Sequence, residues 1–90
     1  MMKIAIDELI THIKMGREIE FNFNSIPYFI EPDYKTQDPK ELKVILCDCS
    51  SNEVGTVIFN GTIPELLTFK FEGKYDLENN YEMMSVEWIL

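Results

Sequence analysis

The stretch GREIEFNFNSIPYFI, residues 16 to 30, holds the pattern that decides the fold. Apolar and polar residues alternate on both sides of an Asn-Ser pair, which is typical of two strands joined by a tight turn. The expected cross-strand pairs are Phe23 with Ile26, Phe21 with Tyr28 and Ile19 with Ile30. The stretch therefore predicts an antiparallel hairpin.

This hairpin has one apolar and one polar face. The six paired side chains share the first face, which we expect to be buried under the preceding helix. The second face carries Glu18, Glu20, Asn22, Pro27, Phe29 and Glu31. We expect that face to be in contact with water, with Phe29 as its single aromatic side chain.

Upstream of the hairpin, residues 3 to 15 predict a helix. The apolar residues that form one stripe at helical spacing are Ile6, Leu9, Ile10 and Ile13. Gly16 suits the left-handed position just after the helix. His12 follows Glu8 by one turn on the polar side, which is typical of a solvated histidine beside a carboxylate rather than a general base.

Downstream, residues 31 to 41 predict a loop, and two further strands are expected near 42–49 and 54–60 with a turn between them. Both strands carry apolar residues in both registers, so we expect both faces of this second hairpin to be covered. Either the second helix or a second copy of the chain supplies that cover.

The last third predicts a short helix and a final strand. Thr62 and Glu65 match a capping box, and Pro64 is tolerated in a first turn, so a helix is expected over 63–70. Residues 76–81 fit a helical turn or a loop. A strand is favoured over a helix near 82–89. Its expected inner residues are Met84, Val86, Trp88 and Leu90.

These elements predict an α+β fold, in which an N-terminal helix packs on a mainly antiparallel sheet of four to five strands, with a short second helix. Ninety residues predict one small domain, 1–90. A hydrophobic content of 46% argues against a disordered chain despite the net charge of −8. No apolar window is long enough for a signal peptide or a membrane span, so we expect a cytoplasmic protein.

The sequence offers no catalytic motif, and we expect a protein that is not an enzyme and that uses no cofactor. Cys47 and Cys49 lie two apart on an expected strand, with both thiols on one face, a geometry that does not favour a disulfide. A metal site of this type needs about four ligands, whereas the chain has one histidine. Reduced, packed thiols and no metal are therefore expected.

The charge is uneven along the chain. Residues 1–45 contain eight acids and six bases, a net of −2, whereas residues 46–90 contain eight acids and two bases, a net of −6. The polar segment around 72–82 is therefore expected to form a negative surface that contacts a basic partner protein, and not nucleic acid or a membrane. The candidate contact residues are Glu72, Tyr75, Asp76, Glu78, Glu82 and, in the 31–41 loop, Tyr34.

The segment LITHIKMGREIEFNFNSIPYFI resembles the opening of small proteins from phages and mobile elements of Gram-positive bacteria, which have a helix, then GREIEF, a tight turn usually made of Asn-Gly, and a Tyr-x-Ile strand. Here Asn24 keeps its place in the turn and Ser25 replaces the usual glycine. The resemblance covers about a quarter of the chain and implies no activity. It implies a mobile-element setting, with location in the host cytoplasm, in which small acidic proteins often inhibit host machinery.

Two hypotheses follow. The first is a non-catalytic binding protein that inhibits a nucleic-acid-handling or defence protein of the host through its acidic surface. The second is a small homo-oligomeric structural or accessory protein, in which a second copy covers the two-sided strands at 42–59. Salt-sensitive partner binding favours the first, and a mass that depends on concentration favours the second.

Overall fold

The structure is a computed structural model, and it describes residues 2–35, 41–51 and 55–90. Within these residues, five strands, three α-helices and one turn of 3₁₀ helix follow one another. They are α1 (Ile6–Lys14), β1 (Ile19–Phe23), β2 (Ile26–Pro32), β3 (Lys43–Asp48), β4 (Thr56–Thr62), α2 (Ile63–Thr68), α3 (Leu77–Asn80), η1 (Tyr81–Met83) and β5 (Met84–Ile89).

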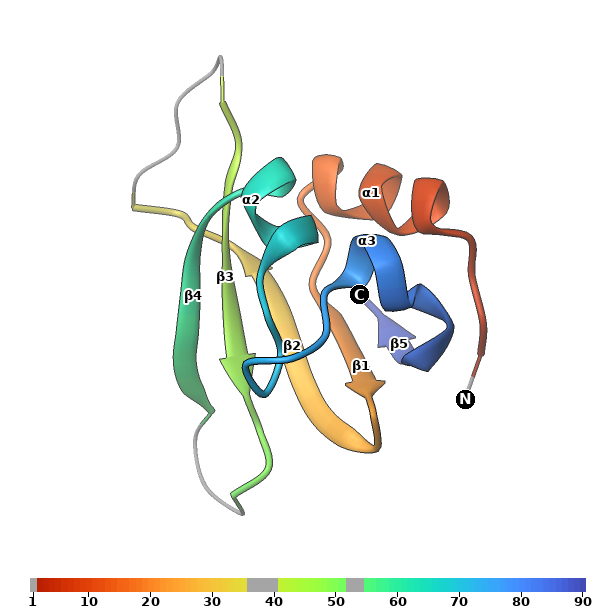
Figure 1. Cartoon of the computed structure of the whole chain (residues 1–90). Coiled ribbons are helices and arrows are strands. Elements are labelled where there is room, and N and C mark those ends of the chain that lie inside the picture. Colours follow the sequence, from red (N-terminus) through yellow and green to blue (C-terminus); the bar gives the residue numbers. More distant parts are fainter. Residues whose placement is uncertain (1, 36–40, 52–54) are drawn as a thin grey trace.

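The strands form one antiparallel sheet in the order β4-β3-β2-β1-β5. The three helices lie on one face of this sheet, as Figure 1 shows, and the opposite face carries no helix in the described part of the chain. The α+β fold with an N-terminal helix, an antiparallel sheet and a short second helix is thus confirmed. The sheet has five strands.

The first hairpin has the predicted register, with Phe21 opposite Tyr28. Both turn residues have left-handed backbone angles, with φ of 52° at Asn24 and 67° at Ser25. Such angles give a turn whose twist matches that of the two strands. The side chains of Phe21 and Tyr28 are buried, which confirms the assigned inner face.

Helix α1 buries Leu9 and Ile13, as its apolar stripe predicted, and ends before a left-handed Gly16 with φ of 77°. The helix begins at Ile6 rather than at residue 3. The reason is that Met2 is extended and exchanges two backbone hydrogen bonds of 2.8 Å with Val86 of β5. Backbone groups that pair with a strand are not available to an earlier helical turn.

His12 is less solvated than its position on the helix predicted. Its Nε2 lies 3.7 Å from Oε2 of Glu8, and its side chain is only 20% exposed. Its Nδ1 is buried and has no hydrogen-bond partner within the described residues. His12 is therefore close to the carboxylate of Glu8, as predicted, but its imidazole ring is half-buried.

The centre of the core is Phe71, which follows α2 in a segment without regular structure. Its ring centroid lies 4.5 Å from that of Phe23 and 4.8 Å from that of Tyr28. The ring of Phe69 lies edge-on to the same ring, with the two centroids 5.3 Å apart. The aromatic face of the first hairpin is thus covered by the connection between α2 and α3 as well as by α1.

The second hairpin is covered on one side only, contrary to the sequence prediction. Val44 and Leu46 point into the core, whereas Val57 is 57% exposed and Ile58 is 36% exposed. All three helices use the inner face, so the outer apolar residues stay uncovered in one copy of the chain. The predicted strand residue Val54 and most of the predicted loop, residues 36–40, lie outside the described residues.

A bulge between Glu20 and Phe21 in the pairing of β1 with β5 changes the predicted faces of the last strand. Met84 and Val86 point inward as expected, but Trp88 pairs with Glu20 and is 40% exposed. A bulge adds one residue on one strand and thereby shifts the alternation beyond it. The strand itself is confirmed, and Trp88 belongs to its outer face.

The predicted capping box is present at the start of α2. The backbone N–H of Glu65 donates to Thr62 Oγ1 over 3.4 Å, and the N–H of Thr62 donates to Glu65 Oε1 over 2.9 Å. Two of the unpaired N–H groups at the helix start are satisfied in this way. The helix ends at Thr68, two residues earlier than predicted, because Phe69 turns to an extended conformation.

Candidate functional site

The predicted acidic segment forms a tight loop followed by two short helical turns. Phe71 and Tyr75 pair as an isolated bridge, and Glu72 at the loop has a left-handed φ of 55°. The exposed Glu72 carboxylate accepts a hydrogen bond of 2.9 Å from Asn24 Nδ2. The turn of the first hairpin and the acidic loop therefore hold each other in place.

Asp76 is a structural residue of this segment. Its side chain is 4% exposed, and its carboxylate accepts hydrogen bonds from Lys70 Nζ at 3.1 Å and from Asn79 Nδ2 at 2.9 Å. Burial by itself raises the pKa of this carboxyl, but the lysine and the asparagine outweigh it and the net pKa is lowered. A buried carboxylate with these partners is not free to contact another protein.

The remaining predicted residues are distributed over more than one surface. Glu78 and Glu82 are exposed on α3 and η1, and Tyr75 is half-buried against the core. Tyr34 is exposed beyond the other end of β2, and its hydroxyl lies 3.4 Å from Glu18. The structure thus gathers residues 72–76 in one loop and 78 and 82 just after it, and separates Tyr34 from both.

Lysines interrupt the negative charge around residues 72–82. Lys70 pairs with Asp76, and Lys74 is exposed within the loop. Lys3 reaches in from the N-terminal segment and donates to the backbone carbonyl oxygens of Glu82, at 2.9 Å, and Met84, at 2.7 Å. The local field is therefore weaker than the count of acids in the sequence predicted.

A second acidic surface lies on the helix-free side of the sheet, which we name the open sheet face. Phe29 and Trp88 lie on it with ring centroids 6.2 Å apart, and Glu20 pairs with both residues across the strands. The outward residues that define this face are Glu20, Asn22, Phe29, Glu31, Lys43, Ile45, Cys47, Val57 and Trp88.

Acids surround the aromatic pair of the open sheet face. Glu20 and Glu31 are outward strand residues, and Glu87 accepts a hydrogen bond from the outward Asn22. Glu18 lies beside Tyr34 at the margin. The arrangement of an apolar centre with a negative rim is suited to a partner surface with an apolar anchor and basic residues around it.

The two cysteines are chemically quiet. Both are free and half-buried. Burial, and after it the charge of Glu31, raises the pKa of the Cys47 thiol; burial, and after it the charge of Glu20, raises that of Cys49. A raised pKa keeps the thiol protonated at neutral pH and makes it a poor nucleophile or metal ligand.

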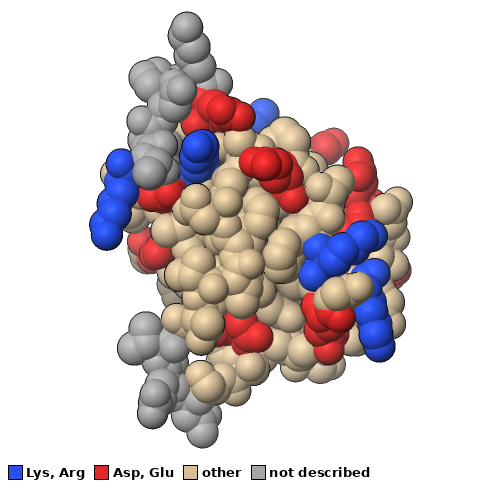
Figure 2. Space-filling view, turned by 60° about the vertical axis from the view of Figure 1, so that its left-hand side comes forward, with Lys and Arg blue, Asp and Glu red and all other residues tan. Residues whose placement is uncertain are grey.

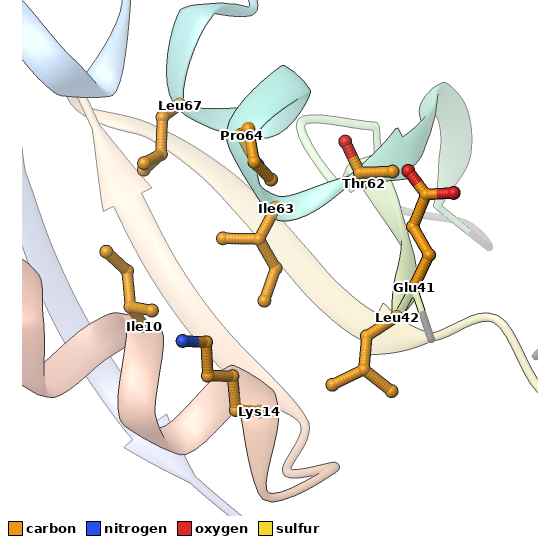
Figure 3. Close-up of a pocket in the computed structure, with 8 residues that line it drawn as sticks. All are labelled: Ile10, Lys14, Glu41, Leu42, Thr62, Ile63, Pro64 and Leu67. Atoms are coloured by element: carbon orange, nitrogen blue, oxygen red, sulfur yellow. The ribbon is translucent and has the colours of Figure 1, made fainter. Parts of the chain in front are cut away.

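A groove of about 640 Å³ separates α1 from the start of α2. Ile10 and Lys14 line it from α1, and Ile63 and Leu67 line it from α2 (Figure 3). Leu42, just before β3, forms a third wall. Sequence reasoning did not detect this groove, because its walls come from three segments that are far apart in the chain.

In residues 2–35, 41–51 and 55–90, no three His, Cys, Asp or Glu side chains come together as a metal site. In the same ranges, no helix has the length and apolar character that crossing a membrane requires. No known protein family, curated protein or solved structure matches this chain.

Proposed function

We propose that this chain is a non-catalytic binding protein that docks on a basic surface of a partner protein through its open sheet face. The single observation that carries the proposal is the exposed Trp88 and the neighbouring Phe29 within a rim of glutamates. Exposed aromatic residues at the centre of a patch are the typical anchors of protein interfaces. The rim charges raise the association rate with a basic partner.

The mobile-element setting implied by the resemblance supports a partner in the host cell. Host proteins that handle nucleic acid, defence proteins among them, carry the basic grooves that a negative surface fits. Occupying such a groove inhibits the host protein without any chemical step. Direct binding to nucleic acid is disfavoured by the net charge of −8.

The test is affinity capture from a bacterial lysate at low and at high salt, with mass spectrometry of the retained proteins. Wild type is compared with the triple variant Glu20→Lys, Glu31→Lys and Glu87→Lys, which reverses the rim of the open sheet face. The matched control makes the same charge change at exposed positions of the predicted segment, with Glu72→Lys, Glu78→Lys and Glu82→Lys.

We expect the first triple variant to lose the proteins that wild type retains at low salt, and the control to keep them. Loss with the control alone would move the interface to residues 72–82. If both variants retain the same proteins at the same salt, the acidic surfaces have no role in capture and the proposal is wrong. Circular dichroism spectra of all three proteins check that the fold is kept.

A second candidate function is a homo-oligomeric accessory protein, and the edge strand β4 favours it. Figure 2, in which β4 comes forward, shows a broad area free of charged side chains in the middle of the view. β4 has no charged residue over Thr56–Thr62, and within the described residues it pairs with β3 alone. An uncharged edge strand is a template for pairing with another strand.

Sedimentation velocity over a wide concentration range tests this second candidate. A mass that rises with concentration in wild type, and stays that of one chain in Val57→Lys, supports pairing of copies at β4. The exposed position of Val57 makes the lysine tolerable in the single chain. A constant monomer mass in wild type up to high concentration would remove the candidate.

A further inference from the structure

The groove between α1 and α2 has the composition of a small-molecule site. Ile10 of α1 faces Ile63 and Leu67 of α2 across it, and Leu42 closes one side. Its volume of about 640 Å³ lies within the range of ligand pockets, which are mostly apolar with a few placed polar groups. Here the polar residues of the lining are Lys14, Glu41 and Thr62.

Lys14 is the one positively charged residue among the described residues that line the groove. Figure 3 shows its ammonium group directed into the space between Ile10 and Ile63. In the described ranges Lys14 forms no ion pair. Lys14 is an exposed residue of α1, and an ammonium group at the wall of the groove can form a charge-assisted hydrogen bond with an anion bound there.

Two described carboxylates near the groove, those of Glu41 and Glu65, do not pair with the ammonium group of Lys14, which can therefore pair with a ligand. Glu41 is directed away from Lys14, toward Thr62 (Figure 3), and Glu65 accepts hydrogen bonds from Thr62 as part of the helix cap. Neither acid neutralises Lys14 from within the chain. Charge complementarity therefore favours an anion at the Lys14 end. The apolar side chains favour hydrocarbon at the other end.

We propose that this groove binds a small amphipathic carboxylate, with the carboxylate on Lys14 and the alkyl chain or ring against Ile10, Ile63 and Leu67. A protein partner needs about 1,000 Å² of interface or more, which a groove lined by eight residues does not supply. For a ligand of about twelve non-hydrogen atoms, the expected dissociation constant is on the order of 0.1–1 mM.

The experiment is a titration with decanoate, below its micelle concentration, followed by methyl and indole NMR signals. 1-Decanol serves as the neutral ligand of equal chain length. The variants are Lys14→Gln and, as a matched loss of one exposed positive charge elsewhere, Lys74→Gln. Unchanged spectra outside the mutated sites show that both variants keep the fold.

We expect saturable shifts of the Ile10, Ile63 and Leu67 methyl signals with decanoate. In Lys14→Gln the affinity for decanoate should fall about tenfold, to that of 1-decanol, whereas Lys74→Gln should bind as wild type. The proposal is overturned by shifts that do not saturate, by shifts centred on the Trp88 indole, or by an equal loss of affinity in both variants.

Discussion

Replacing Phe71 by alanine should destabilise the protein more than any change on the open sheet face. The ring is fully buried and has close contacts with Phe23, Tyr28 and Phe69. Truncation of a buried phenylalanine costs about 3 to 5 kcal/mol in the free energy of unfolding. Against a total of about 5 to 13 kcal/mol for ninety residues, the variant keeps only part of its stability.

Urea denaturation followed by far-UV circular dichroism measures this loss. With a slope of about 1.5 kcal/mol per molar urea, the midpoint should fall by about 2 to 3 M. Phe71→Leu is the variant that keeps folding measurable, with an expected loss of about 1 to 2 kcal/mol. Phe29→Ala, on the half-buried outer face, is the matched control, with an expected loss of about 1 kcal/mol.

Equal midpoints for Phe71→Ala and Phe29→Ala would refute the reasoning. They would mean that the segment between α2 and α3 does not close the core, and that the aromatic face of the first hairpin is covered by α1 alone.

Four further predictions concern single positions. Ser25→Gly should raise the free energy of unfolding by about 0.5 to 1 kcal/mol, because φ of 67° strains a serine; a lower thermal midpoint would show that the hydroxyl matters more. Gly61→Ala should lower the thermal midpoint, at a cost of about 1 to 3 kcal/mol, because an added Cβ would lie 2.9 Å from both Phe59 Cζ and Glu65 Oε1; an unchanged midpoint would contradict this close approach. Asp76→Asn should destabilise the protein at neutral pH, because the pKa of the Asp76 carboxyl is lowered in the folded state. The stabilisation by Asp76 is therefore present above the unfolded-state pKa of about 3.9 and is lost as pH falls through the folded-state pKa. Calorimetry from pH 7 to pH 2 should therefore show the difference in midpoint shrinking below about pH 4, and a constant difference would exclude this role. Phe21→Ala should cost about 3 to 5 kcal/mol and Glu20→Ala under about 0.5 kcal/mol; similar denaturation midpoints for the two would contradict the assigned faces.

The first hairpin could be predicted from the sequence because local chemistry determines it. Alternation fixes which residues share a face, and the Asn24-Ser25 pair fixes the register, so all three predicted cross-strand pairs are present. The cap of α2 is equally local, since Thr62 and Glu65 need only each other.

The position of Phe71 could not be predicted in the same way. Phe71 stands between Lys70 and Glu72 in a segment with no periodicity. Its burial depends on three aromatic residues of the first hairpin that are distant in sequence, namely Phe21, Phe23 and Tyr28. Bulges have no reliable signature in composition either. The one beside Phe21 moved Trp88 to the outer face, and with it the centre of the proposed interface.

The distribution of charge along the sequence shows where the acidic residues are, but it does not show which residues lie beside them in the folded protein. The few bases in the second half of the chain predict a negative surface over residues 72–82, yet Lys3 reaches this segment from the opposite end of the sequence. Glu20 and Glu31 were assigned to the outer face of the hairpin from alternation alone. Their place in the proposed interface depends on Trp88, which lies opposite Glu20 only in the folded sheet.

The unequal edges of the sheet limit how copies of this chain could assemble. A filament needs a free edge on both sides, because each copy must accept one neighbour and offer itself to the next. The backbone of Met2 is hydrogen-bonded to Val86 in the middle of β5. Within the described residues, no segment pairs with the outer edge of β4 in this way. In the homo-oligomer proposed above, copies would pair from β4 to β4 about a twofold axis, so we expect growth to stop at two copies. We therefore expect the bridge formed by Met2 to protect the β5 edge against fibre formation, and removal of the first residues to expose that edge.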